Sequence, residues 1–394
     1  MNDSSARRLL VPLNPLYRMA LAFRELSLLW PAKRLRYPVV SIGNLSTGGA
    51  GKTPLTIALA RALGMRGIRV DILSRGYGRE GYLAARVDEE GSAEEYGDEP
   101  LLMARETGAP VYVAAQRYDA GLLAEAEHKA AQAAARSLPG KQPRASAGPA
   151  SREQPDKSGS AGVPVKPELE VGPTPPESGT AEAAAPEEPK PPLPPLVHLL
   201  DDGFQHRQLA RDVDILLLDS RDWRDWLLPA GNLREPLEAA RRADVIAIPA
   251  NEPELEVALQ MWGWEKPIWL ISRPMDIPEV PGPVAAFCGI ARPEQFFAGL
   301  EEAGVEIAAR FAFPDHFTYT RHALDEMLAN AQAAGAKALI TTEKDLVRLK
   351  KMTSLFSESM PLATARLRIK IDNHAEAIDW LIKQITPRSN PNHF

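Results

Sequence analysis

The segment that most constrains the fold runs from Pro38 to Thr53 and reads PVVSIGNLSTGGAGKT. The apolar β-branched residues at its start predict a short buried strand, and the glycines that follow lead into a helix beginning near Thr53. This layout predicts a phosphate-binding loop, because glycines let backbone N–H groups turn toward one anion, Lys52 reaches the β- and γ-phosphates, and the Thr53 hydroxyl can ligate Mg²⁺. We expect the phosphate contacts along Ser46, Thr47, Gly48, Gly49, Ala50, Gly51, Lys52 and Thr53.

The loop departs from the general G-x-x-x-x-G-K-[ST] pattern at one position, because Ser46 stands where the pattern has glycine. A glycine-rich turn that joins a strand to a helix without binding a ligand is the structural alternative. The order of strand, loop glycines, GKT and apolar-faced helix favours the phosphate-binding loop, since this is the context that the motif requires.

Length and composition limit the remaining classes of protein. A chain of 394 residues with 44% apolar residues is long enough for two domains, each with its own core. The single cysteine, Cys288, excludes an internal disulfide and, with no cleavable signal sequence, predicts a reducing cytosolic compartment. The net charge of −6 argues against a general nucleic-acid binder. No uninterrupted apolar stretch approaches the ~20 residues that span a bilayer.

Residues 1–36 differ in charge from the rest of this acidic chain, with seven basic side chains against two acidic ones. Within them, apolar residues recur at helical spacing at Leu16, Met19, Ala20, Phe23, Leu26 and Trp30. A basic amphipathic helix of this kind can lie in a membrane interface, with its arginines held by anionic lipid. Packing of the same face on the protein's own core is the alternative, because periodicity does not say what a face touches.

Alternating strand and helix patterns divide the rest of the chain into two regions. The first, residues 37–266, continues from the phosphate loop to a strand at Arg69–Leu73, which predicts a right-handed parallel crossover. The turn after this strand, Ser74-Arg75-Gly76-Tyr77-Gly78, should lie beside the phosphate loop, because ligands gather at the carboxyl ends of parallel strands. The second region, residues 267–394, alternates short strands with helices of about 10 residues and predicts a smaller parallel sheet. We therefore expect an α/β fold, with a P-loop NTPase-type parallel-sheet domain, a second, smaller α/β/α domain and an N-terminal amphipathic helix.

The first region is interrupted by residues 139–195, which contain fifteen prolines and no aromatic residue. Such a composition cannot bury enough apolar surface to offset the cost of ordering, so we expect a disordered insertion that loops out. A linker between independent domains is the alternative. The strand that follows, residues 196–202, ends in two acids, which favours the second half of a nucleotide site.

This strand end, Asp201-Asp202-Gly203-Phe204-Gln205-His206, is the second chemical landmark. A carboxylate at a strand end near a phosphate loop usually holds Mg²⁺ or its water, which neutralises the β- and γ-phosphate oxygens. Adjacent residues of an extended chain point to opposite sides, so we expect one of the two aspartates to meet the metal directly. A plain turn is the alternative, since Asp-Gly favours turns.

Other candidate residues are ambiguous when each is taken alone. Arg234 and Glu235 lie in a turn-rich loop, where ligand contacts concentrate, but an ordinary exposed ion pair would look the same. Asp98 in Gly97-Asp98-Glu99-Pro100 reads as a helix cap, and a lone loop histidine such as His316 reads as a surface residue. No histidine spacing and no Cys/His cluster predicts a zinc site.

Taken together, the motifs SIGNLSTGGAGKTP, LSRGYG, GDEP, DDGFQHR, NLREP, FPDHF and TTEKD, in this order, resemble the tetraacyldisaccharide 4'-kinase family of the lipid A pathway. The resemblance covers essentially the whole chain apart from residues 139–195 and the ends. It implies Mg²⁺-dependent transfer of the ATP γ-phosphate to the 4'-hydroxyl of tetraacyldisaccharide 1-phosphate, which forms the bisphosphorylated precursor lipid IVA. It also implies two α/β/α domains that close on ATP, and an N-terminal helix on the cytoplasmic face of the inner membrane.

The resemblance further implies a role for each candidate residue. Asp98 would be the general base for the sugar hydroxyl and His316 would be paired with it, so that closure of the two domains assembles the pair. The metal and its hydration shell would be served by Thr53, Asp201, Asp202 and Glu235. Contacts to substrate or phosphate groups would come from Tyr77, Arg117 and Arg234. We expect no nucleic-acid ligand and no obligate protein partner.

Two other classes of protein make different demands on the sequence. A guanine-specific nucleotide switch needs an [NT]-K-x-D element, whereas Lys344 directly precedes Asp345 in TTEKD, and a metallochaperone needs a metal-delivery cluster that the chain lacks. A membrane-surface protein that has lost catalysis would have lost Lys52, Asp98 or Asp202, and all three are present.

Overall fold

The computed structural model describes residues 10–26, 31–49, 51–137, 195–356 and 360–386. Ala50 and Trp30 lie outside these ranges, as does the expected insertion at 139–195 apart from Pro195. The chain forms two compact units, Met1–Ala131 with Pro194–Phe394, and Gln132–Leu193. Apart from the end of one helix, all elements below belong to the first unit.

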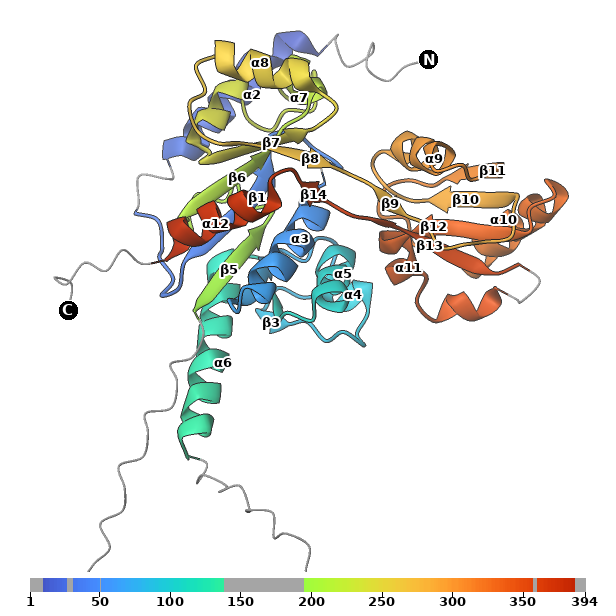
Figure 1. The fold of residues 1–394 in the computed structure, drawn as a ribbon, viewed down its shortest axis with the longest axis horizontal. Helices are drawn as coiled ribbons and strands as arrows, with labels where there is room; N and C mark the ends of the chain where they lie inside the picture. The colour runs from blue at the N-terminus through green and yellow to red at the C-terminus, as the bar shows by residue number, and fades with distance from the viewer. Residues whose placement is uncertain (1–9, 27–30, 50, 138–194, 357–359, 387–394) are drawn as a thin grey trace, which may run out of the picture. The chain divides into compact units, whose positions relative to one another are not determined.

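The larger of two sheets has nine strands in the order β14-β8-β7-β6-β1-β5-β2-β4-β3 (Figure 1). Neighbours from β8 through β4 pair in parallel, and the edge strands β14 and β3 pair antiparallel. This confirms the predicted α/β fold with a large, mainly parallel sheet. The strands are β1 (Val39–Asn44), β2 (Arg69–Ser74), β3 (Ala85–Arg86), β4 (Val111–Val113), β5 (Leu196–Asp201), β6 (Val213–Leu217), β7 (Val245–Pro249), β8 (Ile268–Ser272) and β14 (Lys370–Ile371).

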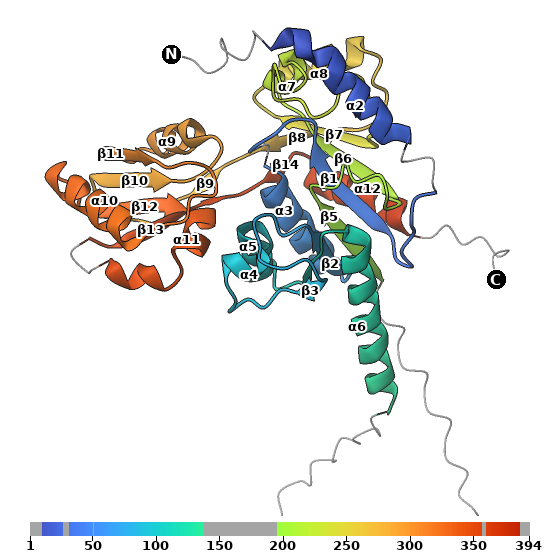
Figure 2. The same cartoon turned by 180° about the vertical axis from the view of Figure 1, so that it is seen from behind.

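Alternate residues of these strands join different apolar cores, as the period of two in a strand requires. Ile215 and Leu217 of β6 join the core under α3, α5 and α12, whereas Leu216 joins the core under α8 and η3. Figure 2 shows the labelled helices beside the strands of this sheet. The elements over the sheet are η1 (Val11–Leu13), α2 (Asn14–Leu26), α3 (Lys52–Met65), α4 (Ala93–Tyr96), α5 (Asp98–Thr107), α6 (Arg117–Ser137), α7 (Ser220–Arg224), η3 (Leu237–Arg242), α8 (Pro253–Met261) and α12 (His374–Ile385).

The second sheet has five strands in the order β11-β10-β12-β13-β9, parallel except for the pair β13 and β9. Helix α9 packs on one face and α10 on the other. The elements are β9 (Met275–Asp276), β10 (Val284–Cys288), α9 (Pro293–Glu302), β11 (Ile307–Ala312), α10 (Arg321–Ala333), β12 (Ala338–Thr342), α11 (Glu343–Leu349), η4 (Lys350–Leu355) and β13 (Leu362–Leu367).

The sequence pattern placed the end of the chain in the second region, residues 267–394, with its smaller sheet. Strand β14 instead pairs with β8, so the chain returns to the nine-stranded sheet. Helix α12 follows and buries Ile378 and Leu381 in the core of that sheet. A strand of two residues carries almost no periodic signal, which is why the pattern did not reveal the return.

Helix α2 packs on the larger sheet through one side only. Tyr17 and Leu21 contact the core under α8. Leu16, Met19 and Phe23 are 58%, 52% and 65% exposed, so most of the apolar face predicted from the sequence is not packed on the protein's own core. No helix within the described ranges combines the length and the apolar composition needed to cross a membrane.

Candidate active site

The predicted phosphate loop leads from the end of β1 into the first turn of α3. Gly48 and Gly51 have φ of 86° and 87°, a backbone region that favours glycine. Gly51 caps α3, so Lys52 and Thr53 are its first residues, and Thr53 is buried. The free N–H groups and the dipole of a helix N-terminus favour an anion at this end.

Residues of the loop are fixed by a distant segment, the NLREP motif. The backbone N–H of Thr47 donates to the carbonyl of Asn232 at 2.8 Å. The carbonyl of Ser46 accepts from Nε of Arg234 at 3.0 Å. The long loop after α7, in which the sequence predicts ligand contacts, therefore lies against the predicted phosphate loop.

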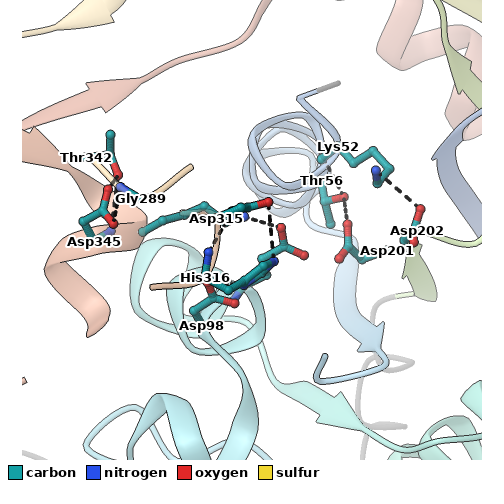
Figure 3. A network of polar contacts seen from close by, with 12 residues as sticks. Lys52, Thr56, Asp98, Asp201, Asp202, Gly289, Asp315, His316, Thr342 and Asp345 are labelled. Carbon is teal, nitrogen blue, oxygen red and sulfur yellow. Dashed lines mark hydrogen bonds and ion pairs between the residues drawn. The ribbon is translucent and has the colours of Figure 1, made fainter. Parts of the chain in front are cut away.

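Lys52 is held by Asn44 and Asp202. Its Nζ donates to Oδ1 of Asn44 at 3.0 Å. The same Nζ lies 3.4 Å from Oδ1 of Asp202 (Figure 3). Arg234 forms two bonds to the Asp202 carboxylate, at 3.0 and 3.1 Å. Burial alone would raise the pKa of Asp202, but Lys52 and Arg234 outweigh it and lower that pKa. Asp202 is therefore a fixed negative charge that orients two cations.

The pKa of Asp201 is shifted in the opposite direction to that of Asp202. Burial and the charges of Glu99 and Asp202 raise the pKa of the Asp201 carboxyl well above its usual range. The hydroxyl of Thr56, on α3, lies 3.4 Å from Oδ1 of Asp201. A carboxylate whose own charge is disfavoured in this way gains from a neighbouring cation.

These side chains fit a magnesium ion. Within the described ranges no three His, Cys, Asp or Glu side chains gather into a metal-holding group. Mg²⁺ does not need such a cage, since it is usually bound by one or two carboxylates together with substrate phosphates and water. The hydroxyl of Thr53 and the carboxylates of Asp201 and Asp202 are the hard oxygen donors that it prefers.

Three other predicted site residues, Arg117, Glu235 and Tyr77, have different surroundings. Arg117, the first residue of α6, is buried, and its Nε has no hydrogen-bond partner among the described residues. Burial lowers the pKa of Arg117, and Asp202 partly offsets this. Glu235 is buried and accepts from Arg242 at 2.5 Å, so it does not form an exposed pair with Arg234. The ring of Tyr77 lies 5.3 Å from that of His316.

Asp98 and His316 are brought together although they are far apart in the sequence. Nδ1 of His316 lies 3.1 Å from Oδ2 of Asp98 (Figure 3). Asp98 opens α5 after Gly97, whose φ of 91° suits glycine, and His316 is also left-handed with φ of 59°. Non-glycine residues with such backbone angles are strained and cluster at functional sites. The hydrogen bond to Asp98 raises the pKa of His316.

Two basic side chains of α11 form ion pairs with Asp98 and its neighbour Glu99. Arg348 donates from Nε to Oδ2 of Asp98 at 2.8 Å, and Nζ of Lys344 donates to Glu99 at 2.5 Å. Burial alone would raise the pKa of Asp98, but His316, Lys344 and Arg348 together lower it. Asp98 is thus ionised at neutral pH, which its interpretation as a helix cap did not suggest.

Several of these contacts were not anticipated from the sequence. Asn44, Thr56, Glu99, Lys344 and Arg348 had no assigned role. Lys344 stands in the TTEKD motif, and Asn44 ends the strand before the phosphate loop, so both carried a signal. Arg348 carried none, because it is one basic residue in a short helix.

The chain is similar in sequence to known proteins over most of its length. A family model described as tetraacyldisaccharide-1-P 4'-kinase matches residues 6–135 and 176–386. The tetraacyldisaccharide 4'-kinase of Koribacter versatilis is 34% identical over 390 residues, which cover 96% of this chain and 99% of that protein. That of Aquifex aeolicus is 33% identical over 371 residues, covering 89% and 92%.

A solved structure agrees with these sequence matches. The crystal structure of "apo" form LpxK from Aquifex aeolicus in complex with ATP has a TM-score of 0.64 and 29% identity. The similarity covers 97% of this chain and all of that one. The chain belongs to the tetraacyldisaccharide 4'-kinase family.

Proposed function

We propose that this chain transfers the γ-phosphate of ATP to the 4'-hydroxyl of tetraacyldisaccharide 1-phosphate, forming lipid IVA. The observation that carries the proposal is the pairing of Asp98 with His316 across the two sheets, in the same region as Lys52 at the N-terminus of α3 (Figure 3). The first group suits activation of a hydroxyl, and the second suits binding of a polyphosphate.

The phosphate end of ATP lies on the loop from Ser46 to Thr53 in this proposal. Lys52, Arg117 and Arg234 neutralise the negative charge that spreads over the phosphate oxygens as the phosphoryl group moves. Asn44 and Asp202 already hold Lys52 in place, so little reorganisation is needed on binding. Magnesium held by Thr53, Asp201 and Asp202, with Glu235 serving its hydration shell, would supply further charge neutralisation at the β- and γ-phosphates.

The Asp98–His316 pair takes the proton of the sugar hydroxyl while the oxygen bonds to the γ-phosphorus and the bond to ADP breaks. General-base help of this kind contributes typically about 10²–10⁴-fold. Tyr77, beside His316, contacts the disaccharide. Because Asp98 and His316 belong to segments that pack on different sheets, we propose that closure of two α/β domains, which meet between β8 and β9, assembles them with ATP bound.

The enzyme acts at the cytoplasmic face of the inner membrane in this proposal. Leu16, Met19 and Phe23 of α2 are exposed together. Apolar side chains on one face of a helix, with basic residues nearby, suit the interface of an anionic bilayer. An acylated acceptor would be reached there.

The test is transfer of ³²P from γ-labelled ATP to tetraacyldisaccharide 1-phosphate in detergent micelles, with Lys52→Ala as the matched control. Labelled lipid from the wild type and not from the variant is the expected result. Lys52-dependent hydrolysis of ATP without labelled lipid would move the assignment to another acceptor or to a nucleotide switch.

A further inference from the structure

Arg348 is a buried cation that the proposed mechanism leaves without a role. Its side chain lies on α11 of the five-stranded sheet and is 6% exposed. Nε and Nη2 donate to Oδ2 of Asp98, Nε at 2.8 Å. Nη1 donates to Oδ1 of Asp345 at 3.1 Å and to the carbonyl of Gly289. One guanidinium thus joins α5, the helix that carries Asp98, to its own helix α11 and to the residue that follows β10.

These contacts determine which atoms of the Asp98–His316 pair remain available. Oδ2 of Asp98 is used by Arg348 and by Nδ1 of His316. Oδ1 accepts one bond, from the backbone N–H of Glu99 at 2.9 Å, and keeps acceptor capacity. On His316, Nε2 lies 3.8 Å from Oδ2 of Asp315, and the side chain is about one-third exposed.

We propose that Arg348 is a positioning residue for the phosphoryl transfer. By fixing Oδ2 of Asp98, it keeps the Asp98 and His316 side chains in hydrogen-bonding position, although they come from segments packed on different sheets. Oδ1 of Asp98 and Nε2 of His316 remain as the atoms that can receive the hydroxyl proton. The inference rests on the proposed function, because only a base at this place needs such positioning.

The charges around the pair give the inference a distinct signature. Lys344 lowers the pKa of both Asp98 and His316, Arg348 lowers that of Asp98, and Asp315 raises that of His316. Nη2 of Arg348 also lies 3.4 Å from Nδ1 of His316. A nearby cation disfavours protonation, so loss of Arg348 raises the pKa of Asp98 and of His316. The pair then becomes protonated at a higher pH, and the acid limb of the rate profile moves upward.

Arg348→Gln and Arg348→Lys separate positioning from charge, and Arg321→Gln is the matched control. Arg321 forms an exposed pair with Asp325 on α10, so its loss should change nothing. In Arg348→Gln we expect kcat to fall about 10- to 100-fold at neutral pH. This is a part of the factor of about 10²–10⁴ that general-base catalysis typically contributes. The acid limb should move to higher pH, and Arg348→Lys should recover part of the rate. The affinity for a fluorescent ATP analogue should remain within about twofold of the wild type, since no phosphate contact is removed.

Two results would overturn the inference. One is a wild-type pH profile in Arg348→Gln. The other is a fall in kcat equal at every pH and not recovered in Arg348→Lys, which would indicate a merely structural ion pair.

A measurement without lipid keeps this test separate from the proposed function. Titration of His316 by NMR in ¹⁵N-histidine-labelled protein, assigned with His316→Gln, should show a higher pKa in Arg348→Gln than in the wild type. An unchanged pKa would refute the contact. A raised pKa in a protein that phosphorylates no lipid would refute the kinase proposal, and with it the positioning role.

Discussion

Asp98→Asn removes the charge of the proposed base and keeps its size, so it isolates what that charge contributes. The Asp98 and Arg348 side chains are both 6% exposed, and the variant leaves the guanidinium without its main counterion. Removing one partner of a buried pair costs roughly 3–5 kcal/mol. Arg348 keeps Asp345 and the carbonyl of Gly289 as partners, so we expect the low end, about 3 kcal/mol.

The loss of unfolding free energy in Asp98→Asn should depend on pH in a known direction. Because cations lower the pKa of folded Asp98, its charge stabilises the fold above the unfolded-state pKa of about 4. This contribution is lost as the pH falls through the folded value. The difference in unfolding free energy between wild type and Asp98→Asn should thus be largest near neutral pH and should shrink below about pH 4.

Urea denaturation from pH 3 to pH 8 and kinase assays at pH 7.5 measure both effects. We expect turnover to fall about 10²–10⁴-fold, the range of general-base catalysis, while nucleotide affinity stays within about twofold. Asp325→Asn, which breaks an exposed pair on α10, is the matched control. An Asp98→Asn enzyme with wild-type turnover would refute the role of the base, and a pH-independent stability difference would refute the ion pairing.

Three further predictions concern other parts of the chain. Arg234→Gln should weaken ATP binding about tenfold or more, measured by isothermal titration, because it removes a proposed phosphate contact and loosens the carboxylate that orients Lys52; unchanged affinity would contradict this. Leu16→Ser with Phe23→Ser should reduce flotation with anionic vesicles while ATP affinity is kept, and full flotation would exclude α2 as the membrane contact. Replacing residues 139–194 by a Gly/Ser linker should leave soluble, active enzyme, since their composition predicts no core; loss of soluble protein would show that they pack.

The sequence predicted best where local chemistry and position in the fold coincide. The strand, the glycines and Lys52 needed only one strand–helix unit to be recognised, and the large parallel sheet is confirmed. Asp201 and Asp202 could be placed near Lys52 because parallel strands end at the same edge. Their opposite pKa shifts could not be predicted, because that of Asp202 depends on Arg234, 32 residues away, and that of Asp201 on its burial and on Glu99.

What the sequence could not provide are contacts between distant segments. Asp98 reads locally as a cap, and only the fold shows that Arg348, 250 residues further on, neutralises it. The same holds for β14, which is too short to show which sheet it joins. Local pattern carries periodicity and turn chemistry, whereas partner choice across sheets depends on the whole packed chain.

The most direct test of the proposed activity is the position of the phosphate in the product. Wild-type enzyme, Mg²⁺-ATP and tetraacyldisaccharide 1-phosphate are incubated in micelles, and the lipid is examined by ³¹P–¹H correlation NMR. We predict a second phosphomonoester signal that correlates with the proton at position 4' of the disaccharide. Unchanged lipid beside accumulating inorganic phosphate, or a phosphate at another hydroxyl, would contradict the proposal.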